Sequence, residues 1–225
     1  MNIALISDVH ANVVALEAVL EDMGGRGVER ILCAGDIVGY YPYPDETVSL
    51  LREREVMCIQ GNHDRAVLST GTGGMNPQAG SAAKWTANNI APFSIAFLRS
   101  LPRHLSLELG GVRVAMYHGA PFDDDHYIFE DEAEEVLLRM AGCELLVLGH
   151  THVPYIKRFP GGTIVNPGSV GQPRDGDPDA CYAIFDTDRR RAAYLRVPYD
   201  IERVAERTVG SGLPRPLADR LWSGR

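Results

Sequence analysis

The feature that most constrains the fold is a series of short apolar segments, each of which ends on an aspartate, an asparagine or a histidine. "NIALISD" ends on Asp8, "RILCAGD" on Asp36 and "VMCIQGN" on Asn62, and the later segments "VRVAMYH" and "CELLVLGH" end on His118 and His150. A continuous apolar run of this length, bounded by turn residues, is typical of a buried strand. Functional residues of open α/β sheets lie at the carboxyl ends of the strands, so these side chains should share one rim.

Helical patterns separate the first three of these segments. Residues 12–25 repeat apolar side chains at helical spacing, with Asn12 offering an N-cap, and residues 45–55 predict a second helix with Asp45 as its N-cap. Alternation of strand and helix predicts a parallel sheet with right-handed crossovers.

The remainder of the chain mixes helices with alternating strands. We expect helices at 81–91, 92–100, 130–142 and 201–209, a hairpin at 105–119, and strands at 143–150, 154–159, 162–168, 181–186 and 192–198. We find no seam between domains, so a single domain over residues 1–225 is expected. A parallel beginning and an antiparallel end predict two sheets packed face to face, with helices outside.

Composition excludes several classes of protein. The chain of 225 residues has no apolar run near the roughly 20 residues that cross a bilayer and no signal peptide, so we expect a cytoplasmic protein that does not contact membranes. Its four cysteines lack the close spacing of a zinc knuckle or redox dithiol. A formal charge of −8 disfavours an extended nucleic-acid footprint but permits a small phosphate substrate beside bound cations.

The histidines gather at the predicted rim. Five of the seven lie there, whereas His104 and His126 have the structural role that is commoner for a lone histidine. Seven residues are candidate metal ligands: Asp8, His10, Asp36, Asn62, His118, His150 and His152. This is too many for one ion and suits two ions that share a carboxylate. Mixed oxygen and imidazole ligands fit manganese, iron, zinc or nickel, and two such ions promote phosphoester hydrolysis.

The same residues carry a family resemblance. The blocks "DVH" (8–10), "GD" (35–36), "GNHD" (61–64), "HG" (118–119) and "GHTH" (149–152) resemble those of the calcineurin-like metallophosphoesterases. "NPGSVGQPRDGDP" (166–178) resembles their small bacterial and archaeal phosphodiesterase-like branch. The resemblance implies an α/β (α+β) fold, a four-layer αββα sandwich of two mixed β-sheets flanked by helices.

Position by position, the resemblance also implies roles. Asp8, His10 and His152 would bind one divalent ion, Asn62, His118 and His150 the other, and Asp36 both, with manganese favoured. A metal-bridging hydroxide would attack phosphorus, His63 would act as general acid or as transition-state donor towards the leaving oxygen, and Asp64 would orient His63. The block "GDIVGY" lacks the acidic residue and arginine that follow the bridging aspartate of protein phosphatases, which disfavours a phosphoprotein substrate.

These observations predict a dinuclear metal-dependent phosphoesterase that acts on a small phosphoester, with a diester favoured. A phosphomonoesterase and a non-catalytic metal-binding scaffold are the alternatives. Three features stay open in the sequence. Arg174 is equally consistent with a phosphate ligand and an ordinary loop arginine, and Tyr40 is expected to pack rather than to meet substrate. The loop and helical insertion at 65–104 could cover the rim, pack on the sheet or support a homodimer.

Overall fold

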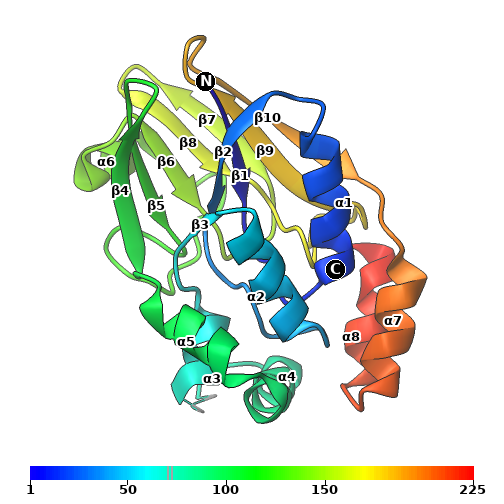
Figure 1. Cartoon of the computed structure of the whole chain (residues 1–225). Helices are drawn as coiled ribbons and strands as arrows, with labels where there is room; N and C mark the ends of the chain where they lie inside the picture. Colours follow the sequence, from blue (N-terminus) through cyan, green and yellow to red (C-terminus); the bar gives the residue numbers. More distant parts are fainter. Residues whose placement is uncertain (70, 72) are drawn as a thin grey trace.

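The computed structural model describes residues 1–69, 71 and 73–225, which form two five-stranded sheets (Figure 1). The first sheet has the order β10-β9-β1-β2-β3, with β1 at Asn2–Ile6, β2 at Val28–Cys33, β3 at Met57–Cys58, β9 at Ala180–Asp186 and β10 at Arg191–Val197. The second has the order β4-β5-β6-β8-β7, with β4 at His104–Leu109, β5 at Val112–Tyr117, β6 at Leu145–Leu148, β7 at Tyr155–Phe159 and β8 at Gly162–Asn166.

Both sheets are mixed, which confirms that part of the expected fold. Strands β1, β2 and β3 are parallel, whereas β9 pairs antiparallel with both β1 and β10. In the second sheet β5, β6 and β8 are parallel, and β4 and β7 are antiparallel edges. The first three strands are parallel and the last two hairpins antiparallel, as predicted, except that β8 also pairs parallel with β6.

The alternation of side chains along β1 explains the layers. Ile3 and Leu5 point into the core between the sheets, where they pack with residues of β5, β6 and β8 such as Val114. Ala4 and Ile6 point the other way, into a core shared with helices α1 (Val13–Met23) and α2 (Pro44–Glu53). Helix α6 (Glu135–Ala141) covers the outer face of the second sheet. The expected four-layer αββα sandwich is confirmed.

The starts of α1 and α2 differ in how well they could be predicted. Asn12 caps α1, since its side chain accepts a hydrogen bond from the N–H of Ala15. Asp45 does not cap α2, so that prediction was wrong: the helix begins at Pro44, whose fixed φ suits the first helical position. The Asp45 carboxylate instead accepts hydrogen bonds from Ala91 N and Ser94 Oγ. These bonds attach α2 to the start of the helix at Pro92–Ser100.

Three helices occupy the region after β3 and lie together below the sheets in Figure 1. They are α3 (Asn62–Ser69), α4 (Pro77–Asn89) and α5 (Pro92–Ser100). We predicted a strand through residue 62 and no helix at α3, but the chain leaves the sheet after Cys58 and turns into the helix. Helix α4 begins earlier than expected because Asn76 caps it, with Pro77 at the first position. Helix α5 lies where it was predicted.

The last part of the chain adds helices beyond the predicted one. Helix α6 is shorter than the predicted 130–142: it starts at Glu135 and ends at Ala141, because Gly142 is left-handed and caps it. Helix α7 (Ile201–Gly210) was predicted, whereas α8 (Arg215–Asp219) and the short 3-10 helix η1 (Arg220–Ser223) were not. Within the described part of the chain, no helix has the length and hydrophobicity that a membrane crossing requires.

Candidate metal centre

The predicted ligands lie together at the carboxyl ends of the parallel strands of both sheets. Asp8 and His10 follow β1, Asp36 follows β2, Asn62 begins α3, and the three remaining histidines, His118, His150 and His152, follow β5 and β6. All of them except the half-buried Asn62 are buried, with at most 5% of the residue exposed. The topology therefore brings together residues up to 144 positions apart in the sequence, which is the distance from Asp8 to His152.

The backbone is bent at five of these positions. Asp8, His10, Asp36, His150 and His152 all have positive φ, between 52° and 70°. This conformation is uncommon for residues other than glycine and costs on the order of 1 kcal/mol or more at each position. Backbone hydrogen bonds between the two rim loops hold it in place, because Asp8 N donates to Gly35 O and His10 N to Asp36 O. Strain of this kind collects at functional sites.

One cluster consists of Asp8, His10 and His152. His152 Nε2 lies 3.2 Å from both Asp8 Oδ1 and His10 Nε2, and His10 Nε2 lies 3.8 Å from the same carboxylate oxygen. Three ligand atoms thus surround one small volume, as a bound cation would require.

A second cluster consists of Asn62, His118 and His150. His118 Nε2 lies 3.1 Å from His150 Nδ1 and 3.0 Å from Asn62 Oδ1. Asp36 lies between the clusters, because its Oδ2 is 3.4 Å from His118 Nε2 and 3.6 Å from His10 Nε2. A single carboxylate oxygen therefore reaches the nitrogen ligands of both groups.

Hydrogen bonds on the outer side of the rings determine which nitrogen faces inward. His118 Nδ1 donates to Ala34 O at 2.8 Å, and His152 Nδ1 donates to Gln172 O at 2.6 Å. His150 Nε2 donates to Asp125 O at 3.1 Å. Since a carbonyl oxygen can only accept, the inward nitrogens of the neutral rings carry lone pairs. This arrangement of ring and backbone carbonyl is the usual support of a metal-bound histidine.

The inward atoms fit divalent cations on chemical grounds. His10 Nε2 and His152 Nε2 lie 3.2 Å apart, His118 Nε2 and His150 Nδ1 lie 3.1 Å apart, and Asp8 Oδ1 is buried without a hydrogen-bond donor among the described residues. A cation between these atoms would be bound by the nitrogens and would satisfy the buried oxygen. Nitrogen and carboxylate ligands without thiolates match manganese, iron, zinc or nickel.

Electrostatics in the cluster favour ionised carboxylates. Burial alone would raise the pKa of Asp36, but the neighbouring His118 and His63 hold it well below its ordinary value. Burial would lower the pKa of His118, whereas the adjacent Asp36 raises it to about 10. Burial lowers the pKa of His150 to about 3, with the charge of His118 as the next cause. The Asp36 carboxylate thus stabilises positive charge beside it, and a metal ion bound next to Asp36 would displace the proton of His118.

His63, the predicted acid, lies on the wall of the site rather than within either cluster. Its ring centroid is 4.5 Å from that of Tyr40 and 4.7 Å from that of His10. Burial lowers its pKa to about 4, against the opposing charge of Asp36. Its Nδ1 is buried beside Gly39, whose φ is +133° and where an added Cβ would come within 2.5 Å of that nitrogen. Glycine at position 39 leaves room for this ring. The role of Gly39 was not predicted from the sequence.

Asp64, predicted to orient His63, contacts the backbone instead. Its carboxylate accepts hydrogen bonds from the N–H groups of Ile37, Val38 and Gly61, and none of its described hydrogen bonds is to the His63 ring. Burial and the charge of Asp36 raise the pKa of Asp64 to about 7, and the three N–H donors oppose this rise. Asp64 therefore holds the loop after Asp36 against the loop before Asn62.

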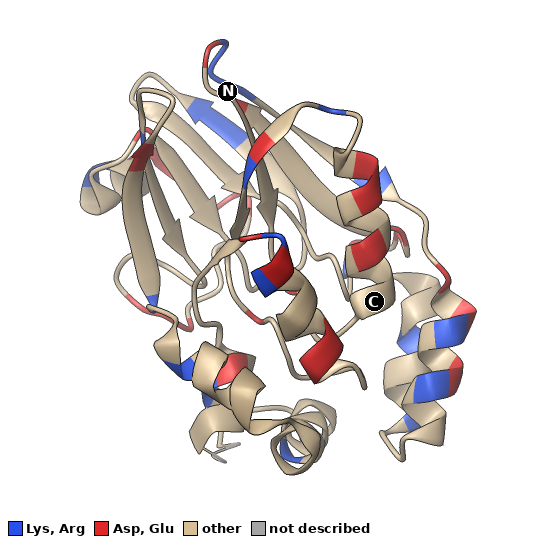
Figure 2. Cartoon of the chain, in the orientation of Figure 1, with Lys and Arg blue, Asp and Glu red and all other residues tan. Residues whose placement is uncertain are grey.

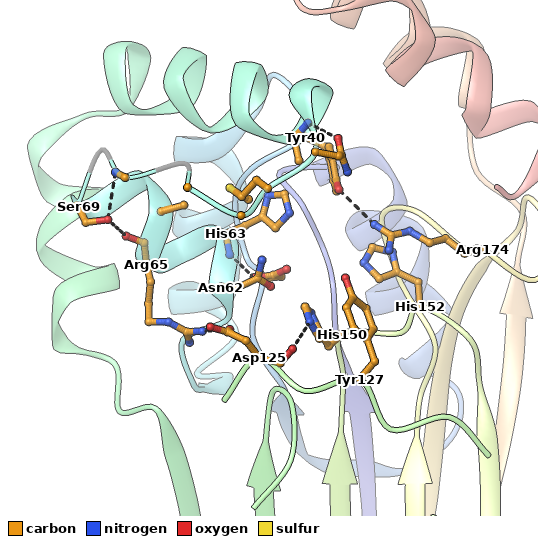
Figure 3. A pocket seen from close by; sticks show the side chains of 18 residues that line it. Tyr40, Asn62, His63, Arg65, Ser69, Asp125, Tyr127, His150, His152 and Arg174 are labelled. Carbon is orange, nitrogen blue, oxygen red and sulfur yellow. Dashed lines mark hydrogen bonds and ion pairs between the residues drawn. The ribbon is translucent and has the colours of Figure 1, made fainter. Parts of the chain in front are cut away.

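The clusters open into a pocket of about 420 Å³, within the range of small-molecule sites (Figure 3). Tyr40 and Arg174 lie at one end of it, and Arg65 and Asp125 form an ion pair at the other. Tyr127 stacks on the His150 ring with centroids 3.8 Å apart. Neither Tyr127 nor Asp125 was singled out in the sequence, because a loop offers no periodic pattern that would identify them.

The segment 65–104 contributes to this pocket. Arg65, Ala66 and Ser69 of α3, the connection including Gly73 and Asn76, and Ala79 of α4 all line it. Helix α5 lies apart from the pocket and packs against α2. Part of the segment therefore lines the pocket.

Comparison with known proteins gives consistent matches. The family described as "Calcineurin-like phosphoesterase superfamily domain" matches residues 1–190. An uncharacterised protein of Methanocaldococcus jannaschii is 36% identical, over 99% of this chain and 98% of its own length. The crystal structure of a metallophosphoesterase from Sphaerobacter thermophilus is 37% identical, with a TM-score of 0.87 over 100% of this chain and 99% of that one. Phosphodiesterase YfcE of Escherichia coli is 24% identical, over 84% of this chain and 89% of its own length.

Proposed function

Since the chain belongs to the calcineurin-like phosphoesterase superfamily, we propose that it is a phosphodiesterase that depends on two divalent metal ions, with manganese favoured. One observation carries the proposal: Asp36 Oδ2 lies 3.4 Å and 3.6 Å from histidine nitrogens of two separate ligand clusters. A single-ion site would leave one of these buried clusters without a cation.

The contacts between the candidate ligands assign them to two ions. Asp8, His10 and His152 would hold one ion, Asn62, His118 and His150 the other, and Asp36 both. Ions bound there would neutralise charge on the phosphoryl oxygens and activate a water molecule for in-line attack. Hydrolysis forms a bond between phosphorus and the water oxygen and breaks the bond between phosphorus and the ester oxygen, which must then gain a proton.

His63 is placed to stabilise that oxygen, whose proton would then come from solvent. Its Nδ1 is buried against Gly39, so Nε2 is the nitrogen that can reach the pocket. The low pKa of His63, which results from burial, keeps the ring neutral near pH 7, so that Nε2–H would donate a hydrogen bond to the departing oxygen in the transition state. Asp64 acts through the backbone, by keeping the two loops that carry Asp36 and Asn62 together.

A small substrate fits the charge distribution better than nucleic acid. Acidic side chains lie on α1 and α2, and α7 carries both signs (Figure 2). Extended binding of a polyanion needs clustered basic residues. The basic side chains that line the pocket are Arg65 and Arg174, together with the histidines, so the attraction for phosphate is local.

The test is hydrolysis of bis(4-nitrophenyl) phosphate by the manganese-loaded protein, compared with 4-nitrophenyl phosphate. We expect the diester to be the better substrate, and Asp36→Asn to lower kcat by at least about 100-fold, since loss of a bridging charge disturbs both ions. Asp188→Asn is the matched control, because Asp188 lies in the turn after β9 and its side chain is 81% exposed. Its kcat should equal that of the wild type. A preference for the monoester would indicate a phosphomonoesterase. A loaded, folded protein without activity would indicate a binding scaffold.

A further inference from the structure

We propose that Arg174 forms an anion subsite beside the metal centre, which binds a second phosphate group carried by the leaving group of the substrate. The inference rests on the proposed function and names the substrate class of that site. It would make the protein selective for esters or anhydrides in which the departing part is itself phosphorylated.

Arg174 is held next to a candidate metal ligand. It lies in the loop between β8 and β9, and its backbone N–H donates to His152 O at 3.2 Å. Its Nη2 donates to the Tyr40 hydroxyl at 3.2 Å and to Gln172 Oε1 at 3.3 Å. The backbone carbonyl of Gln172 also accepts the hydrogen bond from His152 Nδ1. A single residue thus orients both the arginine and the ligand.

The guanidinium lacks a counter-charge among the described residues. No carboxylate of the described chain lies within ion-pair distance of Arg174, and its buried Nε has no acceptor there. Arg65, the other arginine of the pocket, differs because Asp125 neutralises it. A partly buried cation without a counter-charge destabilises the folded protein unless an anion pairs with it. A guanidinium group can form two parallel hydrogen bonds to phosphate oxygens.

A second guanidinium adds to the positive potential at this end of the pocket. Arg220 lies on η1 with its Cζ 5.8 Å from the centroid of the Tyr40 ring, and its Nε donates a hydrogen bond to Arg225 O. Burial and the nearby charge of Arg174 lower the pKa of Arg220. Arg220 lies outside residues 1–190, which the family match covers, so this charge comes from the C-terminal helices.

The position of Tyr40 indicates which side of the substrate is involved. Its ring centroid lies 4.5 Å from those of His63 and His10, so Tyr40, Arg174 and His63 share one wall (Figure 3). Because His63 is the proposed hydrogen-bond donor to the leaving oxygen, this wall faces the departing group. A pocket of about 420 Å³ has room there for more than the scissile phosphate.

Charge balance agrees with a multiply charged substrate. Two divalent cations would outweigh the carboxylates of Asp8 and Asp36, and Arg174 adds another positive charge. A simple aryl diester contributes one negative charge, whereas a phosphorylated leaving group contributes more. The loaded site should therefore favour the second kind of anion.

The test compares inorganic pyrophosphate with inorganic phosphate as inhibitors of aryl diester hydrolysis by the manganese-loaded protein. We expect the wild type to bind pyrophosphate more tightly than phosphate. Arg174→Met should reduce the ratio of the phosphate inhibition constant to the pyrophosphate inhibition constant about tenfold. Arg174→Lys should give a ratio between those of the wild type and Arg174→Met, because lysine keeps the charge but not the guanidinium fork. Arg189→Met is the matched control, since the Arg189 side chain is 81% exposed and pairs with Asp186, and it should leave the ratio unchanged. Metal chelation by pyrophosphate affects all four proteins alike and cancels in the comparison.

An unchanged ratio in both Arg174 variants would overturn the inference, and so would equal weakening of both inhibitors, which would place Arg174 on the scissile phosphate. If the loaded protein hydrolyses no aryl ester, the proposed function fails, and calorimetric titration of the same proteins with pyrophosphate and phosphate still decides the subsite. In that titration, a selective loss of pyrophosphate binding in Arg174→Met supports the anion subsite, and binding without a selective loss contradicts the subsite.

Discussion

At the scale of single residues, the ligand positions combine an uncommon backbone with an ordinary side chain. The positive φ angles of Asp8, His10 and Asp36 turn each side chain inward two to four residues after its strand ends. His150 and His152 have the same backbone conformation, and only Thr151 separates them. This geometry allows two histidines in one tight loop to reach different clusters.

His152→Ala and His150→Ala should therefore weaken different ions. His152 contacts Asp8 and His10, and His150 contacts His118, so each substitution removes one ligand from one cluster. We expect the affinity for the affected ion to fall by about 10–100-fold, the size typical of changes close to a metal site. Calorimetric titration of the metal-free variants with Mn²⁺ would resolve the two binding steps. Equal weakening of both steps in both variants would contradict the division.

The sequence indicated which residues gather at the rim, because apolar strands that end on polar residues identify that edge of the sheets, and their role as metal ligands stays a prediction. It could not predict the residues that support them. Gln172 orients His152 through a backbone carbonyl, and Tyr127 stacks on His150 from a loop. Neither role depends on a side-chain pattern in the sequence, since one uses the backbone and the other depends on where the loop folds.

At the scale of elements, a polar link attaches α1 to the first sheet. Asp22 on α1 accepts hydrogen bonds from Arg26 Nε and Nη2 at 2.8 Å and 2.9 Å, and from the Tyr182 hydroxyl of β9 at 2.6 Å. The bonds from Arg26 lower the pKa of Asp22, burial opposes them, and the bond from Tyr182 lowers it further. Since the pKa is lower in the folded state, the ionised carboxylate stabilises the fold.

We expect Asp22→Asn to reduce the free energy of unfolding by about 1 kcal/mol at pH 7, a modest value because the link is near the surface. The contribution is fully present above the unfolded pKa of about 3.9 and is lost as the pH falls through the lower folded value. The difference from the wild type should therefore shrink below about pH 4. Urea unfolding across this range measures it, with Glu53→Gln as the control, because the Glu53 side chain is 74% exposed. A difference that is constant with pH would refute the assignment.

The elements that were wrongly predicted lie mostly next to the site. Strand β3 contains only Met57–Cys58, and α3 starts at Asn62, where an apolar run and a ligand predicted a longer strand. Tertiary contacts explain the difference: Gly61 approaches Asp36 so closely that an added Cβ would lie 2.0 Å from its Oδ1. The chain must leave the sheet there to bring the loops together, and local pattern does not report such contacts.

At the scale of the whole molecule, the site joins the two sheets. Asp8, His10, Asp36 and Asn62 come from the first sheet and its connections, and His118, His150 and His152 from the second. Without bound cations, two buried carboxylates and opposed histidine nitrogens lie at this junction. Metal ions should therefore stabilise the fold as well as serve the reaction.

Manganese should raise the melting temperature. At a free concentration about 100 times its dissociation constant, a ligand that binds only the folded state adds about 2.7 kcal/mol, which corresponds to roughly 5–10 °C for a chain of this size. Differential scanning fluorimetry of protein treated with EDTA and then titrated with Mn²⁺ measures the shift. Asp36→Asn should lose most of it. A melting temperature that does not depend on the metal would contradict a buried centre between the sheets.

If Asp36 lies between two ions, anomalous X-ray diffraction from manganese-soaked crystals should locate both of them. We expect two anomalous peaks separated by about 3.5–4 Å, one beside Asp8, His10 and His152 and one beside Asn62, His118 and His150, with Asp36 next to both. A single peak in a fully loaded crystal, or two peaks of which only one contacts Asp36, would contradict it.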